Sequence, residues 1–111
     1  MNPKHAPDQL RVGLAQIAPI WLDQVRTLDK INKYVSQAAE AGCQLVVFGE
    51  ALLPGYPFWI ERTDGARFDS PVQKDLHAHY MQQAVQIEAG HLELVCQAAE
   101  VGEIAVYLGC I

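Results

Sequence analysis

Two segments of the chain share one pattern, in which a helix-like stretch is followed by a glycine and a short apolar run. The first reads Gln37-Ala-Ala-Glu-Ala-Gly42 and leads into Leu45-Val-Val-Phe48. The second reads Gln97-Ala-Ala-Glu-Val-Gly102 and leads into Ile104-Ala-Val-Tyr-Leu108. The run at 45–48 is continuously apolar rather than alternating, which is typical of a strand buried on both faces of a parallel sheet. The pattern therefore predicts an α/β fold class.

The segment before the first of these strands has the spacing of an amphipathic helix. Across Gln24–Ala41 the apolar residues form one stripe, which we expect to pack against a core. Asp23 is the expected N-cap of this helix and Gly42 its expected C-cap. An earlier apolar run, Arg11–Ile17, is short enough for a strand, and Pro19 ends it. The helical residues expected to face the core are Val25, Leu28, Ile31, Val35, Ala38 and Ala39.

A long connection follows, from Ala51 to about Asp69. Its Pro54-Gly-Tyr-Pro57 run excludes regular helix or strand through that part, and loops of this length are usually functional or disordered. The next helix is expected to start at Ser70 as N-cap, with Pro71 at its first position and Gln73 in capping-box register. Its expected inward residues are Val72, Leu76, Tyr80 and Ala84.

The last part of the chain predicts one more helix and one more strand. The helix is expected over about His91–Val101 and is ended by Gly102. A buried strand is expected over Ile104–Leu108. The inward residues of this helix are expected to be Leu94, Val95, Ala98 and Ala99.

The predicted order is β-α-β-loop-α-α-β. Right-handed crossovers in such a chain place parallel strands side by side, with helices packed on the sheet. Residues 1–10 are polar and contain prolines, so we expect a flexible tail there and a single domain over residues 11–111. Ligands of such sheets gather at the carboxyl ends of the strands. Glu50 lies two residues past one such end and Cys110 two residues past another.

Composition and charge exclude several classes of partner. The 111 residues carry a net charge of -5 with eight Lys and Arg and no basic run, so we expect no nucleic-acid partner. The start of the chain lacks the apolar region of a signal peptide, and no apolar stretch approaches the ~20 residues of a membrane span. We therefore expect a cytoplasmic protein without a membrane partner.

The cysteines and histidines do not have metal-site spacing. Cys43, Cys96 and Cys110 form no CxxC pair or Cys/His cluster, so free thiols are expected. His77 and His79 are two apart on a predicted helix and point to different sides. No metal or other cofactor is expected.

Glu50 is the main candidate for chemistry. It follows apolar or small residues and precedes Ala51-Leu-Leu53, so we expect its carboxylate to leave the strand end in an apolar neighbourhood. A carboxylate in such a place can serve as a general base or proton shuttle. The alternative is that Glu50 caps the next segment or pairs with a surface arginine.

The run Phe48-Gly-Glu-Ala-Leu-Leu-Pro-Gly-Tyr-Pro-Phe-Trp59 resembles the segment around the catalytic glutamate of the nitrilase, or carbon-nitrogen hydrolase, superfamily. The flanks follow the family order too: an opening strand with Gln16, a Trp21-Leu-Asp23 approach to the first helix, and a late helix that leads into a strand ending in glycine. The Pro-Gly-Tyr-Pro run is more similar to the nitrilase branch than to the amidase branches. The resemblance covers nearly the whole chain from Val12 onward and corresponds to the N-terminal part of the family.

The resemblance implies a partial nitrilase-type α-β-β-α sandwich and hydrolysis of nitrile or related carbon-nitrogen bonds to carboxylic acid and ammonia. Glu50 would be the proton acceptor that activates a cysteine nucleophile, and a lysine would stabilise the charged intermediate. Tyr56 matches a position near the substrate pocket, and Phe58 and Trp59 would line an apolar wall. The alternative for these aromatic residues is simple packing. A small nitrile or amide substrate and a homo-oligomeric parent protein are implied.

The family's lysine and nucleophilic cysteine motifs do not occur in this chain. Lys4 falls in the predicted tail, and Lys30, Lys33 and Lys74 fall on predicted helix faces. Cys110 lies near Glu50 in the predicted topology, but its context differs from that of the nucleophile, and we expect a core thiol. The chain alone is therefore expected to be an inactive, truncated part of such a hydrolase.

Two other hypotheses belong to different functional classes. The first is a non-catalytic interaction module that docks on a full-length homologue, because an unfinished sheet exposes edge groups and apolar faces. The second is a nucleotide-binding α/β unit. Gln16-Ile-Ala-Pro-Ile20, which follows the first strand, has no glycine for a phosphate to approach, and this argues against that unit.

Overall fold

The computed structural model describes residues 8–65 and 67–111. In chain order the elements are β1 (Val12–Ala15), α1 (Gln24–Glu40), β2 (Leu45–Phe48), α2 (Trp59–Arg62), α3 (Pro71–Gln82), the 3-10 helix η1 (Ile87–Ala89), α4 (Glu93–Gly102) and β3 (Ala105–Tyr107). Most of the tail predicted over residues 1–10 lies outside the described residues.

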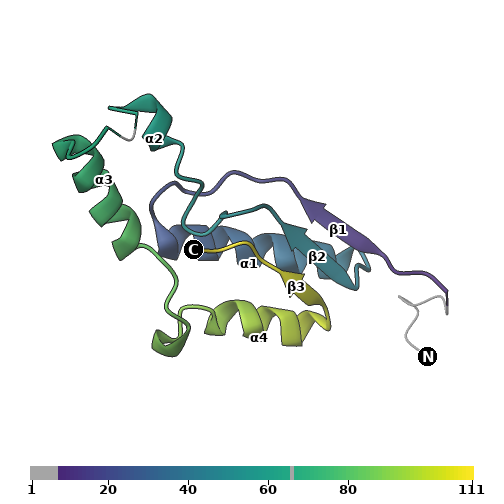
Figure 1. Cartoon of the computed structure of the whole chain (residues 1–111). Helices are drawn as coiled ribbons and strands as arrows, with labels where there is room; N and C mark the ends of the chain where they lie inside the picture. The colour runs from purple at the N-terminus through teal and green to yellow at the C-terminus, as the bar shows by residue number, and fades with distance from the viewer. Residues whose placement is uncertain (1–7, 66) are drawn as a thin grey trace.

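The three strands form one parallel sheet, as the sequence predicted, and their order is β1-β2-β3. The register aligns Leu14 with Val47 and Val47 with Tyr107. Both crossovers step across the sheet in the same direction. Because such crossovers are right-handed, α1 and α4 fall on the same face of the sheet. Figure 1 shows α1 and α4 together on that side, with α2 and α3 in an arm beyond the end of the sheet.

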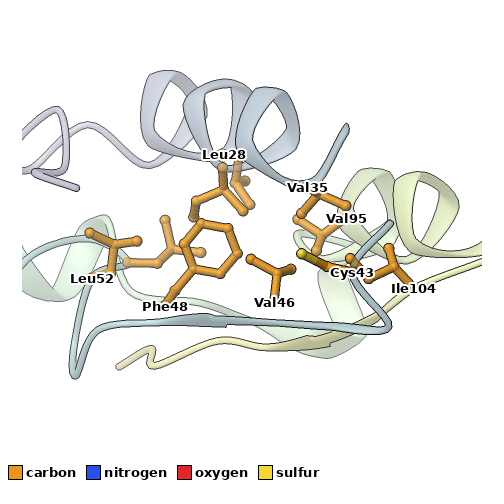
Figure 2. Packing of buried hydrophobic residues seen from close by; sticks show 10 residues of the cluster. Leu28, Val35, Cys43, Val46, Phe48, Leu52, Val95 and Ile104 are labelled. Atoms are coloured by element: carbon orange, nitrogen blue, oxygen red, sulfur yellow. The ribbon is translucent and has the colours of Figure 1, made fainter. Parts of the chain in front are cut away.

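The main core lies between the sheet and these two helices, as Figure 2 shows. Val46 and Phe48 of β2 point toward the helices and are almost fully buried. They meet Ile31 and Val35 of α1, which have no exposed surface, and Val95 of α4. Parallel sheets are normally covered on both faces, and the described helices cover one face of this sheet.

The opposite face of the sheet is open in the described chain. Leu14 and Tyr107 are 72% and 69% exposed, and Leu45 and Val47 are half-buried. The prediction that the strands are buried on both faces is therefore wrong for this chain. On the open face the residues of β2 are half-buried, and those of β3 are exposed. The physical reason is that both helices lie on one side. The structure is an α/β fold with one sheet and one helical layer, which agrees with the partial α-β-β-α sandwich that the resemblance implies.

Several helix predictions hold in detail. The Asp23 side chain accepts a hydrogen bond from the Arg26 amide and caps α1. The Ser70 Oγ accepts from the Gln73 amide at 3.3 Å, so the predicted N-cap of α3 is confirmed. The Gln73 side chain donates to the Ile60 carbonyl at 3.4 Å and to Thr63 Oγ1 and does not bond back to Ser70, so the second bond of a capping box is not formed. The C-cap of α1 is Ala41 rather than Gly42.

Other details differ from the predictions. Val25, Val72 and Leu94 are exposed, whereas an adjacent residue in each helix is buried (Gln24, Gln73 and Val95), so these three side chains lie off the buried face of their helices. The long connection contains the short helix α2, which the proline pattern did not indicate. The first and last strands are shorter than predicted, at four and three residues.

Among residues 8–65 and 67–111, no helix combines the length and the apolar character needed to cross a bilayer.

Truncation of a core residue tests the described packing. Ile31→Ala should lower the free energy of unfolding by about 2–5 kcal/mol, because it removes buried atoms and leaves a cavity. Val25→Ala, on the same helix but 74% exposed, should change it by less than about 0.5 kcal/mol. Urea unfolding followed by circular dichroism measures both values. Equal losses from the two substitutions would contradict this placement of α1.

Candidate active site

Glu50 directly follows Gly49 at the carboxyl end of β2 and is exposed. Its neighbours Ala51 and Leu52 are buried, so the chain turns inward immediately after it. No described residue forms an ion pair with its carboxylate or donates a hydrogen bond to it. The expected apolar surrounding of Glu50 is therefore not supplied by this part of the protein, and neither is the arginine partner of the alternative hypothesis.

The end of β3 meets the segment that follows Glu50. The Leu53 amide donates to the Gly109 carbonyl at 3.3 Å, and the Ile111 amide donates to the Leu53 carbonyl at 2.9 Å. These bonds make a parallel bridge between Leu53 and Cys110. The sequence prediction that the two strand ends lie together is confirmed at the level of the backbone.

Cys110 is exposed, so the prediction of a core thiol is wrong for the described chain. β3 is an edge strand, and the segment after it has no described neighbour strand on its outer side. An apolar hollow of about 320 Å³ opens beside this edge, between β3 and α4. Val95, Ile104 and Cys110 are among the residues that line it.

Trp21 anchors the loop that carries Tyr56 and Phe58. Its indole ring lies 4.6 Å from the Phe58 ring, centroid to centroid, and its Nε1 donates to the Tyr56 carbonyl at 3.4 Å. Gly55 has a φ of +141°, and a Cβ there would lie 2.7 Å from Trp21 Cδ1. Only glycine therefore allows this close approach. The sequence analysis named Trp21 only in the approach to the first helix and not as a contact of this loop, because only the tertiary structure links positions 21 and 55.

The predicted pocket residues divide into two groups. Tyr56 and Phe58 are 60% and 42% exposed. The Phe58 ring contacts Trp21 and has the Arg62 guanidinium 5.8 Å from its centroid, so the Tyr56 ring is the more available of the two to a ligand or a further layer of protein. Trp59 is buried in a second cluster, edge-on to Tyr80 with a centroid distance of 6.1 Å and packed near Leu22. For Trp59 the contacts match the packing alternative. A hollow of about 250 Å³ lined by Trp59 and neighbouring α3 residues does not include Glu50.

The described lysines engage groups on their own helices or nearby loops. Lys30 donates to the Ala18 carbonyl at 2.7 Å, Lys33 lies 3.7 Å from Asp29, and Lys74 pairs with Asp69. Lys4 lies outside the described residues. Residues 8–65 and 67–111 contain no group of three or more His, Cys, Asp or Glu side chains that could hold a metal.

Comparison with known proteins gives one family and a consistent set of relatives. The family described as carbon-nitrogen hydrolase matches residues 11–111. An arylacetonitrilase of Aspergillus oryzae is 36% identical over 103 residues, which is 93% of this chain and 29% of that protein. An arylacetonitrilase of Aspergillus niger is 36% identical over 94% of this chain. A protein named nitrilase 2, from an unknown prokaryotic organism, is 30% identical over 93% of it. The chain spans about 30% of the length of these relatives.

The buried Tyr80 predicts a pH dependence of stability. Burial raises the pKa of Tyr80, and the hydroxyl has no hydrogen-bond partner among the described residues. Unfolded tyrosine ionises near pH 10, so the unfolded chain loses this proton before the folded one. The corresponding stability is fully present below about pH 10 and is lost as the pH rises through the raised folded pKa.

We therefore expect the free energy of unfolding to fall above about pH 10, and to fall less in Tyr80→Phe. Urea unfolding from about pH 8 to about pH 11, a range that spans the ionisation of unfolded tyrosine, measures this difference. Tyr107→Phe removes an exposed hydroxyl and is the matched control. If the Tyr80→Phe and wild-type curves have the same alkaline slope, the assignment is wrong.

Proposed function

The chain belongs to the carbon-nitrogen hydrolase family, and we propose that it forms part of a nitrilase-type enzyme in which Glu50 is the proton acceptor. The observation that supports this most directly is the position of Glu50. It follows β2 at the carboxyl edge of a parallel sheet, where ligands of such sheets bind, and it has no described structural partner. An exposed acid with no structural role is available for proton transfer.

The proposed reaction converts a nitrile and two waters into a carboxylic acid and ammonia. Glu50 takes the proton of a cysteine thiol, and the thiolate attacks the nitrile carbon. Glu50 passes this proton to the nitrile nitrogen, which gives a thioimidate. A first water adds to the same carbon and its two protons go to the nitrogen, which leaves as ammonia and leaves a thioester. A second water breaks the carbon–sulfur bond, which releases the carboxylic acid and returns a proton to the cysteine. A lysine stabilises the charge that develops during these steps. Both the cysteine and the lysine would come from protein outside these 111 residues.

The substrate we propose is a nitrile with an aromatic group. Several relatives are named arylacetonitrilases. Tyr56 and Phe58 support the idea, because they present exposed rings on a loop that Trp21 holds in place. An aromatic ring packs favourably against such rings, at about 0.5–1.5 kcal/mol beyond the area that it buries.

A chimeric enzyme tests the role of Glu50. The 103 matched residues of the Aspergillus oryzae arylacetonitrilase are replaced by the corresponding residues of this chain. We expect ammonia release from an arylacetonitrile, and Glu50→Gln should lower kcat/KM at least about 100-fold, because general-base catalysis contributes that much or more. Glu40→Gln, at the exposed end of α1, is the charge-matched control and should keep the activity.

The isolated chain is the second control and should release no ammonia, because its described lysines are engaged elsewhere and the nucleophile motif is absent. Two results would contradict the proposal. One is a chimera that keeps its activity when Glu50 is replaced by Gln. The other is turnover by the isolated chain.

The open face of the sheet favours a second candidate function, that of an interaction module. Leu14 and Tyr107 are largely exposed and lie in one lateral row with Val47. This row carries no charge, and an apolar sheet face of this kind usually packs on another sheet. We propose that the same face could dock a full-length homologue, and that homo-oligomerisation of the parent protein is compatible with it. The cytoplasmic location stays a prediction.

Sedimentation velocity tests the module. The purified chain should self-associate in a concentration-dependent manner and co-sediment with the Aspergillus oryzae arylacetonitrilase. Leu14→Lys should weaken both associations at least about tenfold, because it puts a charge into an apolar contact. Lys33→Glu on the exposed side of α1 tests whether any charge change has the same effect. A wild-type chain that stays monomeric and binds no homologue would remove this candidate.

A further inference from the structure

Gly109 lies against the backbone of Glu50. A Cβ built on Gly109 would be 2.4 Å from the Gly49 carbonyl oxygen, 2.8 Å from the Ala51 nitrogen and 2.9 Å from Glu50 Cα. All three neighbours are backbone atoms, which cannot rotate away as a flexible side chain can. The chain after β3 therefore touches the peptide groups on both sides of Glu50, and any side chain at position 109 would push them aside.

The contact lies where the backbone after β2 is unusual. Ala51 has a φ of +53°, in the left-handed region, although it is not a glycine, and it is 6% exposed. Such a conformation costs on the order of 1 kcal/mol and persists only where the surroundings determine it. The surroundings here include Gly109, and the two hydrogen bonds between Leu53 and the segment 109–111 hold the contact in register.

The carboxylate of Glu50 has no such support from side chains. Within the part of the chain that the structure describes, no ion pair or hydrogen bond orients it. Among the described residues, the constraint on this side chain is therefore the direction of its Cα–Cβ bond, which the backbone at Glu50 sets. That backbone is held on one side by β2 and on the other by Gly109.

We propose that Gly109 is a positioning residue for Glu50, because its lack of a side chain lets the end of β3 fix the Glu50 backbone. This inference rests on the proposed function of Glu50 as proton acceptor. A base must reach its proton at hydrogen-bond distance, and a displacement of about 1 Å can cost ~100-fold in rate. A methyl group at Gly109 requires a displacement of that order.

The chain offers a matched control one residue before Glu50. A Cβ built on Gly49 has no heavy atom within 4 Å, and Gly49 does not have a positive φ. Gly49→Ala therefore adds the same methyl group to the same edge of the sheet without a steric clash. A difference between the two variants reports the contact at Gly109 and not the loss of a glycine.

The first test uses nuclear magnetic resonance on the intact chain. In the wild type we expect cross-relaxation between the Gly109 Hα protons and Glu50 Hα. Gly109→Ala should shift the Glu50 side-chain carboxyl signal and speed hydrogen exchange of the Leu53 and Ile111 amides at least about tenfold, as expected for local opening. Gly49→Ala should leave these signals and rates close to those of the wild type.

Two results would overturn the proposal. The first is the absence of cross-relaxation between Gly109 and Glu50 in the folded wild type, which does not depend on how any variant folds. The second is a folded Gly109→Ala variant whose Glu50 carboxyl signal is unchanged.

The second test separates this proposal from the proposed function. In the chimeric enzyme, Gly109→Ala should lower kcat about 10- to 100-fold while KM changes less than about twofold, since the base is misplaced and the substrate wall is intact. Failure of the proposed function appears as a chimera whose activity survives Glu50→Gln. Failure of the positioning role appears as a chimera that needs Glu50 but keeps full kcat with Gly109→Ala.

Discussion

The handedness of the two parallel crossovers determines most of this structure. A strand order of β1-β2-β3 means that each connection steps the same way across the sheet. Right-handed connections then place α1 and α4 on one face, where Val46 and Phe48 meet both helices. The same constraint leaves Leu14 and Tyr107 uncovered on the other face. The handedness of the crossovers therefore decides which apolar face of the sheet is buried and which is left open.

Parallel strands also bring their carboxyl ends to one edge, and this gives the candidate site its shape. Glu50 and Gly109 are far apart in sequence, yet their backbones touch because β2 and β3 are neighbours in register. The side-chain environment of Glu50 is sparse by comparison, so local backbone packing carries the geometry that side-chain hydrogen bonds provide in many active sites. Two separate contacts therefore shape this region: the sheet edge holds Glu50, and Trp21 holds the loop that carries Tyr56.

Features set by short-range chemistry could be predicted from the sequence, whereas features set by distant neighbours could not. The caps at Asp23 and Ser70 follow from a side-chain oxygen three residues before a free amide, and both are present. The apolar pattern correctly found β2, but it cannot tell whether the covering layer belongs to this chain, so Tyr107 was expected inside and is exposed. The same limit applies to aromatic residues in loops. Trp59 packs on Tyr80 from a helix further along the chain, a contact that no local spacing encodes.

Under the proposed function, further protein would cover both the open face of the sheet and the exposed carboxylate of Glu50. Apolar surface is worth roughly 25 cal/mol per Å² when it is removed from water, so covering the open sheet face would contribute substantially to stability. A carboxylate at the edge of the same sheet needs water excluded from it before a nearby thiol and lysine can exert their full electrostatic effect. Any protein layer thick enough to cover the row of Leu14, Val47 and Tyr107 reaches toward that edge, because the strands are only three and four residues long. Completion of the core and completion of the catalytic site are therefore expected to be one structural event in the parent enzyme.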